Sequence, residues 1–152
     1  MRLALFQPDI PQNAGALIRL GACLGVEIEI IEPCGFVLSD KRVRRAGMDY
    51  IEMANVTPHA SWNAWCEARA ARPGRLVLLT SKAAHPYTDF AFSPDDTIML
   101  GRESAGVPSE VHDAADARLR IPLLSGLRSL NVAQAGAMVL GEALRQTNGF
   151  PP

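Results

Sequence analysis

Two polar stretches that follow apolar segments hold residue types that could do chemistry. The first, residues 121–131, carries Ser129 and Asn131 just before a long apolar stretch. The second, residues 101–108, places Glu103 between two glycines. Free backbone N–H groups at a helix start and bare backbone at a glycine turn both suit a polar ligand. Ser and Asn are also ordinary helix caps, and Glu is commonly exposed, so capping and surface roles stay open.

Basic residues stand out at two further places. Arg19 lies among apolar and small neighbours, where a lone Arg is usually an exposed residue. Lys41, Arg42, Arg44 and Arg45 fall within five residues, and three of the four share one helix face. Such a cluster is either a solvated face or a patch that contacts phosphates. In a chain of net charge −1 this uneven distribution favours phosphate contact.

The elements that must position these residues alternate between strand and helix patterns. A strand, a helix and a second strand within the first 31 residues form a βαβ unit. We therefore predict an α/β fold with a mostly parallel sheet and helices on both faces. Strands are expected at residues 3–6, 26–31, 75–80, 97–100 and 118–121, with an extended segment at 50–56. Helices are expected at residues 13–25 (capped by Asn13), 41–46, 61–72, 109–115 and 130–146, with a long polar loop at 81–96.

Three loops follow strands of this predicted sheet, at residues 79–81, 101–108 and 121–131. Ligands of parallel sheets bind at the carboxyl ends of the strands, so these loops should share one pocket. The glycine pattern is neither GxGxxG nor a Walker loop, which leaves the class of ligand open. A small polar or nucleotide-like molecule is expected.

Length and composition predict one globular domain over residues 1–152, with 48% hydrophobic and 20% charged residues. No apolar run approaches the roughly 20 residues that cross a bilayer, and the N-terminus lacks a signal-peptide pattern. We therefore expect a cytoplasmic protein without a membrane partner. The three cysteines are an odd number without metal-ligand spacing, which predicts free buried thiols and no metal site.

Four stretches taken together resemble the SPOUT-class RNA 2′-O-methyltransferases. Residues 13–19 resemble the first motif (Asn, then Gly, then Arg), residues 100–108 the second and residues 121–131 the third. Residues 40–50 resemble a signature of the small TrmL, or YibK-like, subgroup, which methylates the wobble nucleotide of tRNA. Each motif alone is degenerate, but the four in order over almost the whole chain are specific. Residues 123–127 depart from the pattern of the family.

The resemblance implies an α/β fold whose C-terminal chain forms a deep trefoil knot, and an obligate homodimer. It implies methyl transfer from S-adenosyl-L-methionine to the ribose 2′-OH of tRNA nucleotide 34, a cytidine or modified uridine, in leucine tRNAs. The anticodon stem-loop would be the part of the tRNA that is bound. Two alternatives remain open: the same chemistry at another tRNA or rRNA position, and a non-catalytic RNA-binding dimer.

The resemblance also assigns roles to residues of this chain. Arg19 would orient the acceptor hydroxyl, with Asn13, Ser129 and Asn131 holding Arg19 and the acceptor. The cofactor would be bound by Leu79, Thr80, Gly101, Glu103, Gly106, Ile121, Ser129 and Leu130. The tRNA backbone would be contacted by Lys41, Arg42, Arg44, Arg45 and Arg128. Because the donor is already activated, the reaction needs no metal.

Overall fold

The computed structural model describes residues 1–37, 41–47, 50 and 52–152. In this part of the chain a seven-stranded sheet with the order β3-β2-β1-β6-β4-β7-β5 forms the centre of the molecule. All its strand pairs are parallel, which confirms the predicted parallel sheet. The strands are β1 (Arg2–Phe6), β2 (Glu27–Ile31), β3 (Val56–His59), β4 (Leu76–Leu79), β5 (His85–Pro86), β6 (Thr97–Leu100) and β7 (Ala117–Arg120).

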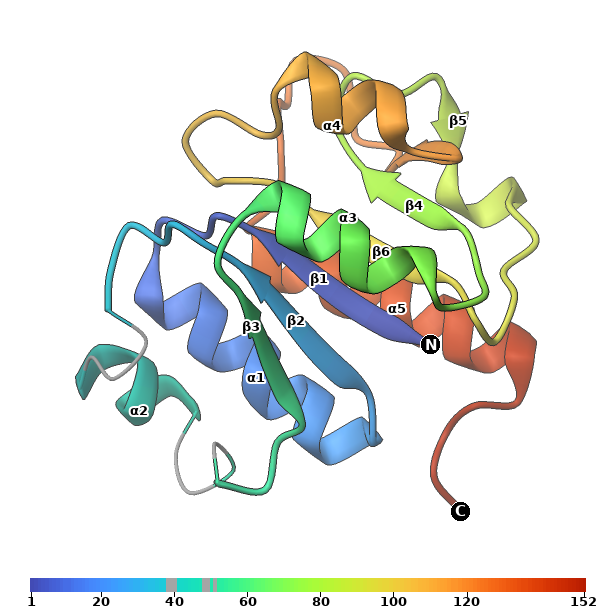
Figure 1. Cartoon of the computed structure of the whole chain (residues 1–152). Coiled ribbons are helices and arrows are strands. Elements are labelled where there is room, and N and C mark those ends of the chain that lie inside the picture. Colours follow the sequence, from blue (N-terminus) through green and yellow to red (C-terminus); the bar gives the residue numbers. More distant parts are fainter. Residues whose placement is uncertain (38–40, 48–49, 51) are drawn as a thin grey trace.

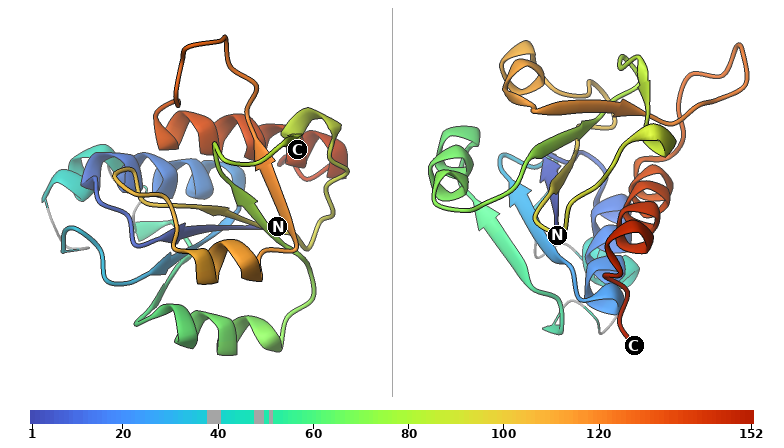
Figure 2. Two further views of the ribbon diagram at one scale, coloured as in Figure 1. Left: turned by 90° about the horizontal axis from the view of Figure 1, so that it is seen from above. Right: turned by 90° about the vertical axis from the view of Figure 1, so that its right-hand side faces the viewer.

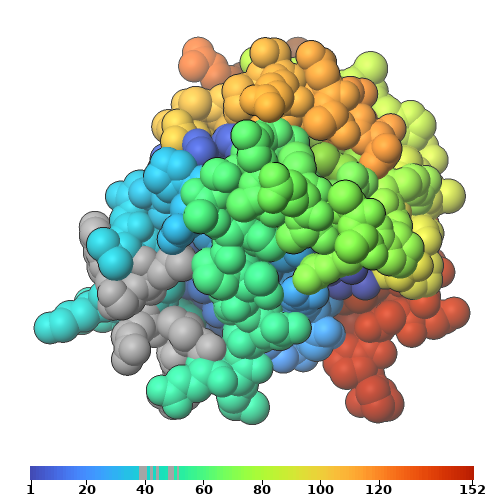
Figure 3. All heavy atoms as spheres, in the orientation of Figure 1, coloured from blue at the N-terminus to red at the C-terminus, as the bar shows by residue number. Residues whose placement is uncertain are grey.

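Helices cover both faces of the sheet, as predicted (Figures 1 and 2). One face carries α1 (Pro11–Leu24), α2 (Lys41–Gly47) and α5 (Val132–Thr147). The other face carries α3 (Trp62–Ala70) and α4 (Ser109–Ala114). In the space-filling view, α3 spreads over the middle of this second face and α4 lies above it (Figure 3).

Side chains alternate between two cores, one on each side of the sheet, because successive strand residues point to opposite faces. From β1, Leu3 and Leu5 join the core beneath α1 and α5. Ala4 and Phe6 join the core that Trp65 of α3 closes. Trp65 is 1% exposed, so its large aromatic side chain is fully buried in this second core.

Two glycines in α1 allow other parts of the chain to approach closely, as their small size predicts. A Cβ on Gly15 would lie 2.6 Å from the carbonyl oxygen of Val43 in α2. A Cβ on Gly21 would lie 2.6 Å from the side chain of Ile28 in β2. The basic helix α2 is therefore packed directly against α1.

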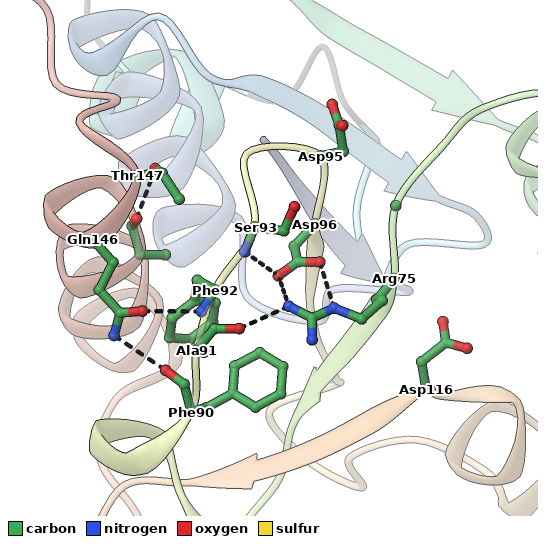
Figure 4. A network of polar contacts seen from close by, with 12 residues as sticks. Arg75, Phe90, Ala91, Phe92, Ser93, Asp95, Asp96, Asp116, Gln146 and Thr147 are labelled. Carbon is green, nitrogen blue, oxygen red and sulfur yellow. Dashed lines mark hydrogen bonds and ion pairs between the residues drawn. The ribbon is translucent and has the colours of Figure 1, made fainter.

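Polar contacts fasten the C-terminal end of α5 to the segment that precedes β6 (Figure 4). Gln146 accepts a hydrogen bond from the N–H of Phe92 at 2.9 Å and donates to the carbonyl of Phe90 at 3.1 Å. Beside it, Arg75, which directly precedes β4, forms an ion pair of 2.7 Å with the fully buried Asp96, which raises the pKa of the guanidinium. These contacts hold α5, whose other end reaches the candidate site, against the sheet.

Two sequence-based expectations about the fold need correction. The extended segment expected at residues 50–56 is wrong, because the strand begins only at Val56 and runs over four residues as an edge strand. It contains Pro58, a residue tolerated at sheet edges but a poor sequence signal for a strand. The loop expected at residues 81–96 contains the short edge strand β5 and a 3₁₀ turn. The trefoil knot implied by the resemblance stays a prediction.

None of the helices in the described residues is long and apolar enough to cross a membrane. The three cysteines are free thiols, but the burial predicted for them is wrong: Cys23 is exposed, and Cys34 and Cys66 are only partly buried. Partial burial raises the pKa of Cys34 to about 11.

Candidate functional site

A cavity of about 380 Å³ lies at the carboxyl ends of β4 and β6. Its walls are the three predicted strand-end loops, joined by Ile10 and Asn13 from the start of α1 and by the first turn of α5. Small-molecule pockets typically measure roughly 300–1,000 Å³, so the cavity has the size of a ligand site. The parallel sheet forms this site because all its strands end at the same edge.

All eight residues predicted to bind the cofactor line this one cavity. They come from three separate parts of the chain: Leu79 and Thr80; Gly101, Glu103 and Gly106; Ile121, Ser129 and Leu130. Their common feature is a position in one of the three loops that follow strands, and the sequence pattern located these loops. Their role in binding stays a prediction.

The Glu103 side chain is partly buried and links the turn after β6 to the start of α1, which is far from it in sequence. One carboxylate oxygen accepts a hydrogen bond from the Asp9 N–H at 2.9 Å. The other accepts from the side-chain amide of Asn13 at 3.0 Å. The Asn13 oxygen in turn accepts from the side-chain amide of Asn131 at 2.9 Å. These bonds join all three predicted motif regions, and they favour a structural or site role of Glu103 over a surface role.

Asn13 is not the helix cap that the sequence predicted. α1 begins at Pro11, with Ile10 as the capping position, so Asn13 is inside the helix and does not cap it. Proline is favoured at the first helical position because its missing N–H would be unsatisfied there anyway. The 8%-exposed Asn13 side chain is thereby freed for Glu103 and Asn131.

Asn131 has the capping role that the sequence left open, and it also makes a contact across the site. Its side-chain oxygen caps α5 by accepting hydrogen bonds from the N–H groups of Ala133 at 2.9 Å and Gln134 at 3.3 Å. Its side-chain nitrogen donates to Asn13. The first turn of α5 is therefore fixed to the first turn of α1 at the cavity wall.

Asp9 and Ser104 form a second link across the same loops. Both the backbone N–H and the hydroxyl of Ser104 donate to the Asp9 carboxylate. These donors hold the pKa of Asp9 below its usual range. The turn after β6 is thus tied to the loop after β1 at two neighbouring points, Glu103 and Ser104.

The predicted cations are distributed unevenly around the site. Arg128 lines the cavity. Arg19 does not line it; it is exposed on α1, with its guanidinium carbon 5.1 Å from the ring centre of Tyr50. Lys41 and Arg45 are exposed on α2, also away from the cavity. The side chains of Arg42 and Arg44 lie outside the described part of the structure.

Sequence reasoning missed several wall residues, among them Ile10, Ser81, Arg102 and Leu123. Ser81, Arg102 and Leu123 lie inside the three predicted loops but were given no role of their own, and Ile10 lies just before the predicted helix. Whether such a residue faces the cavity depends on the local course of the turn, which residue types do not specify.

The cavity fits a cofactor held largely by backbone groups. Gly106 lines it with φ +67°, and no atom lies within 4 Å of the place where its Cβ would be, so bare backbone is presented there. Leu78, Leu100 and Val107 add apolar wall. Among the described His, Cys, Asp and Glu residues, no group of three could hold a metal ion.

Comparison with known proteins gives a consistent result. A model of the SpoU rRNA Methylase family matches residues 1–141. A tRNA (cytidine(34)-2′-O)-methyltransferase of Ancylobacter novellus is 59% identical over 150 residues, covering 99% of this chain and 95% of that protein. The protein of the same name from Escherichia coli K12 is 40% identical over 153 residues, covering 99% and 96%.

Solved structures agree with the sequence relatives. A structure described as giving insights into the 2-OH methylation of C/U34 on tRNA superposes with a TM-score of 0.91 at 37% identity, covering 95% of this chain and 94% of that one. The SpoU methyltransferase AviRb of Streptomyces viridochromogenes, in complex with AdoMet, superposes with a TM-score of 0.86 at 26% identity. That match covers 96% of this chain and 60% of AviRb.

Proposed function

The chain belongs to the SpoU rRNA methylase family, and we propose that it methylates the ribose 2′-OH of nucleotide 34 of tRNA. The methyl donor is S-adenosyl-L-methionine. Cytidine 34 and modified uridine 34 of leucine tRNAs are the proposed targets. The observation that carries this proposal is the single cavity in which the three motif regions meet, linked by Glu103, Asn13 and Asn131.

The residues at the cavity are proposed to have different roles in binding and alignment. When bound, S-adenosyl-L-methionine supplies a methyl group already activated by a sulfonium. Leu79, Gly101 and Ile121 present strand-end backbone that would hold it in the cavity. Asn13 and Asn131 fix the wall on the side of α1 and α5, and Ser129 offers a hydroxyl to the acceptor ribose. The main contribution of the protein is alignment of the reacting atoms, which lowers the barrier without a metal.

Arg19 is proposed to position the acceptor hydroxyl and to stabilise negative charge that develops on it. A guanidinium stays protonated near neutral pH, so it donates hydrogen bonds and does not act as a general base. Because Arg19 does not line the cavity of its own subunit, this role places it at the cavity of a second copy.

A homodimer is accordingly part of the proposal. Ile10 and Leu130 are cavity residues that are 41% and 39% exposed, and Met138 of α5 is 43% exposed. Apolar side chains that are exposed together at a rim commonly mark a surface that binds another protein. A second copy packed on α1 and α5 would cover them and close the cavity. We place the enzyme in the cytoplasm, where its tRNA substrate is modified.

The basic helix α2 is proposed to contact the tRNA backbone near the anticodon. Lys41 and Arg45 are exposed there, and α2 packs on the helix that carries Arg19. Phosphate contacts of this kind position a nucleic acid without reading its sequence.

The direct test measures methyl transfer from labelled S-adenosyl-L-methionine to tRNA from cells that lack the enzyme. The modified nucleoside is then mapped by mass spectrometry. We expect a 2′-O-methyl group at nucleotide 34 of leucine tRNAs. Label at another tRNA position or in rRNA would refute the target, and binding of cofactor and RNA without any transfer would favour a non-catalytic dimer.

A further inference from the structure

Arg102 is held firmly at the edge of the cavity by the turn between β6 and α4. Its N–H donates to the carbonyl of Gly106 at 2.9 Å, and its carbonyl accepts from the N–H of Gly106 at 2.9 Å. A Cβ on Gly101 would lie 2.7 Å from the carbonyl carbon of Gly106, so the two sides of the turn are in close contact. The side chain of Arg102 therefore projects from a rigid base.

The Arg102 guanidinium has hydrogen-bonding capacity that the described residues leave unused. Its Nε atom is buried and has no hydrogen-bond partner among them. The two neighbouring carboxylates are already engaged: Glu103 by Asp9 and Asn13, and Asp9 by Ser104. A buried N–H without an acceptor is costly, and a bidentate oxyanion is the partner that matches a guanidinium best.

Arg128 brings a second positive charge to the same cavity. Glu103 is the only carboxylate among the described residues that line it, so cations outnumber anions on its wall. Charge excess in a recessed, partly apolar site attracts an anion more strongly than the same charge on an open surface.

We propose that Arg102 and Arg128 together bind one oxyanion of a substrate in this cavity. The inference rests on the proposed function, whose two substrates each carry such a group. One is an RNA phosphate beside the acceptor ribose, and the other is the carboxylate of the methyl donor. Arginine suits both, because its planar fork places two N–H groups in register with two oxygen atoms.

The test measures binding to the full-length protein and to its Arg102→Ala, Arg102→Lys and Arg128→Ala variants. S-adenosylhomocysteine, which has the carboxylate, and 5′-methylthioadenosine, which lacks it, are titrated by calorimetry. An anticodon stem-loop RNA is titrated by fluorescence anisotropy at several salt concentrations. Arg145→Ala serves as the control, because Arg145 is exposed on α5 and does not line the cavity.

Two results support the inference and identify the oxyanion. If it is the carboxylate, Arg102→Ala and Arg128→Ala each weaken S-adenosylhomocysteine about tenfold and leave 5′-methylthioadenosine unchanged. If it is an RNA phosphate, S-adenosylhomocysteine and 5′-methylthioadenosine keep their affinities. The RNA then binds about tenfold more weakly, and the slope of log K against log salt falls by about 0.7. In either case Arg102→Lys is intermediate, because it keeps the charge and loses the fork.

The inference is overturned if Arg102→Ala changes none of the three affinities by more than twofold, or if the two alanine variants affect different ligands. If Arg102→Ala lowers the thermal midpoint of the protein, the Arg102→Lys variant decides the test instead. Wild-type affinity of Arg102→Lys for all three ligands then also overturns the inference. Methyl transfer by the wild-type protein is measured in parallel. Wild-type protein that binds the ligands but methylates no tRNA refutes the proposed function alone, whereas binding of neither substrate refutes both.

Discussion

At the scale of single residues, Glu103 shows how one side chain unites a site from distant parts of the sequence. Both of its oxygens accept hydrogen bonds, one from the loop before α1 and one from α1 itself. A glutamine in its place can satisfy only one of these donors with its oxygen, and its NH₂ group opposes the other.

We therefore predict that Glu103→Gln weakens binding of S-adenosylhomocysteine about tenfold, since an unsatisfied buried donor costs about 1–3 kcal/mol. Calorimetry measures the affinity, and a thermal melt shows whether the fold is retained. Glu110→Gln is the matched control, because Glu110 is an exposed glutamate of α4 that does not line the cavity. An affinity within twofold of wild type would mean that the Glu103 contacts do not shape the site.

A substitution of Arg19 can separate the effect on cofactor binding from the effect on methyl transfer. Because it lies outside the cavity, Arg19→Ala should abolish methyl transfer while S-adenosylhomocysteine binds as in the wild type. Single-turnover transfer to tRNA and calorimetry with S-adenosylhomocysteine measure the two quantities. A loss of cofactor affinity of more than tenfold would exclude the proposed role in positioning the hydroxyl.

The residues of the site differ in how far the sequence could predict them. Leu79, Gly101 and Ile121 were selected through the family resemblance, and the strand-end loops that hold them were recognised independently from the apolar runs that precede them. Asn13 was selected, but its predicted cap role was wrong, because Pro11 starts the helix one half-turn earlier. Arg102 was missed, because the direction of a side chain on a closed turn depends on backbone pairing between positions 102 and 106.

At the scale of elements, long apolar strands were predicted well and edge strands poorly. β6 was predicted at its observed bounds, Thr97–Leu100, because a buried central strand is a continuous apolar run. β3 and β5 were not, because each contains a proline and has only one strand neighbour in the sheet. Edge strands are held by the sheet they join more than by their own residues.

The helix α2 gives the prediction that belongs to this scale. Replacing both Lys41 and Arg45 by Ala should weaken binding of tRNA and flatten its salt dependence. The slope of log K against log salt should fall by roughly 1.4–1.8 if each residue contacts one phosphate. Affinity for S-adenosylhomocysteine should not change, because neither residue lines the cavity.

Titrations of tRNA at several salt concentrations measure the slope for this double variant. Arg145→Ala, on the far end of α5, should leave the slope unchanged and so controls for loss of surface charge in general. A wild-type slope in the double variant would assign Lys41 and Arg45 to a solvated surface.

At the scale of the whole molecule, the proposed role of Arg19 requires two copies of the chain. Arg128 and the polar links lie at the cavity, whereas Arg19 is exposed and does not line it. We propose that a second copy packs on the exposed apolar residues Ile10, Leu130 and Met138 and brings its Arg19 to this cavity. Dimer formation and catalysis should therefore be lost together.

Met138→Asp tests this connection, because it places a charge on the exposed side of α5 at an apolar residue of the proposed interface. We predict that the variant sediments as a monomer in analytical ultracentrifugation, keeps its helical circular dichroism and loses methyl transfer. Met53→Asp is the control: Met53 is 77% exposed, lies before β3, and should tolerate the same change as an active dimer. A Met138→Asp variant that remains an active dimer would remove α5 from the interface. An active monomer would show that Arg19 is not needed at a second cavity, because no second subunit would be present to supply it.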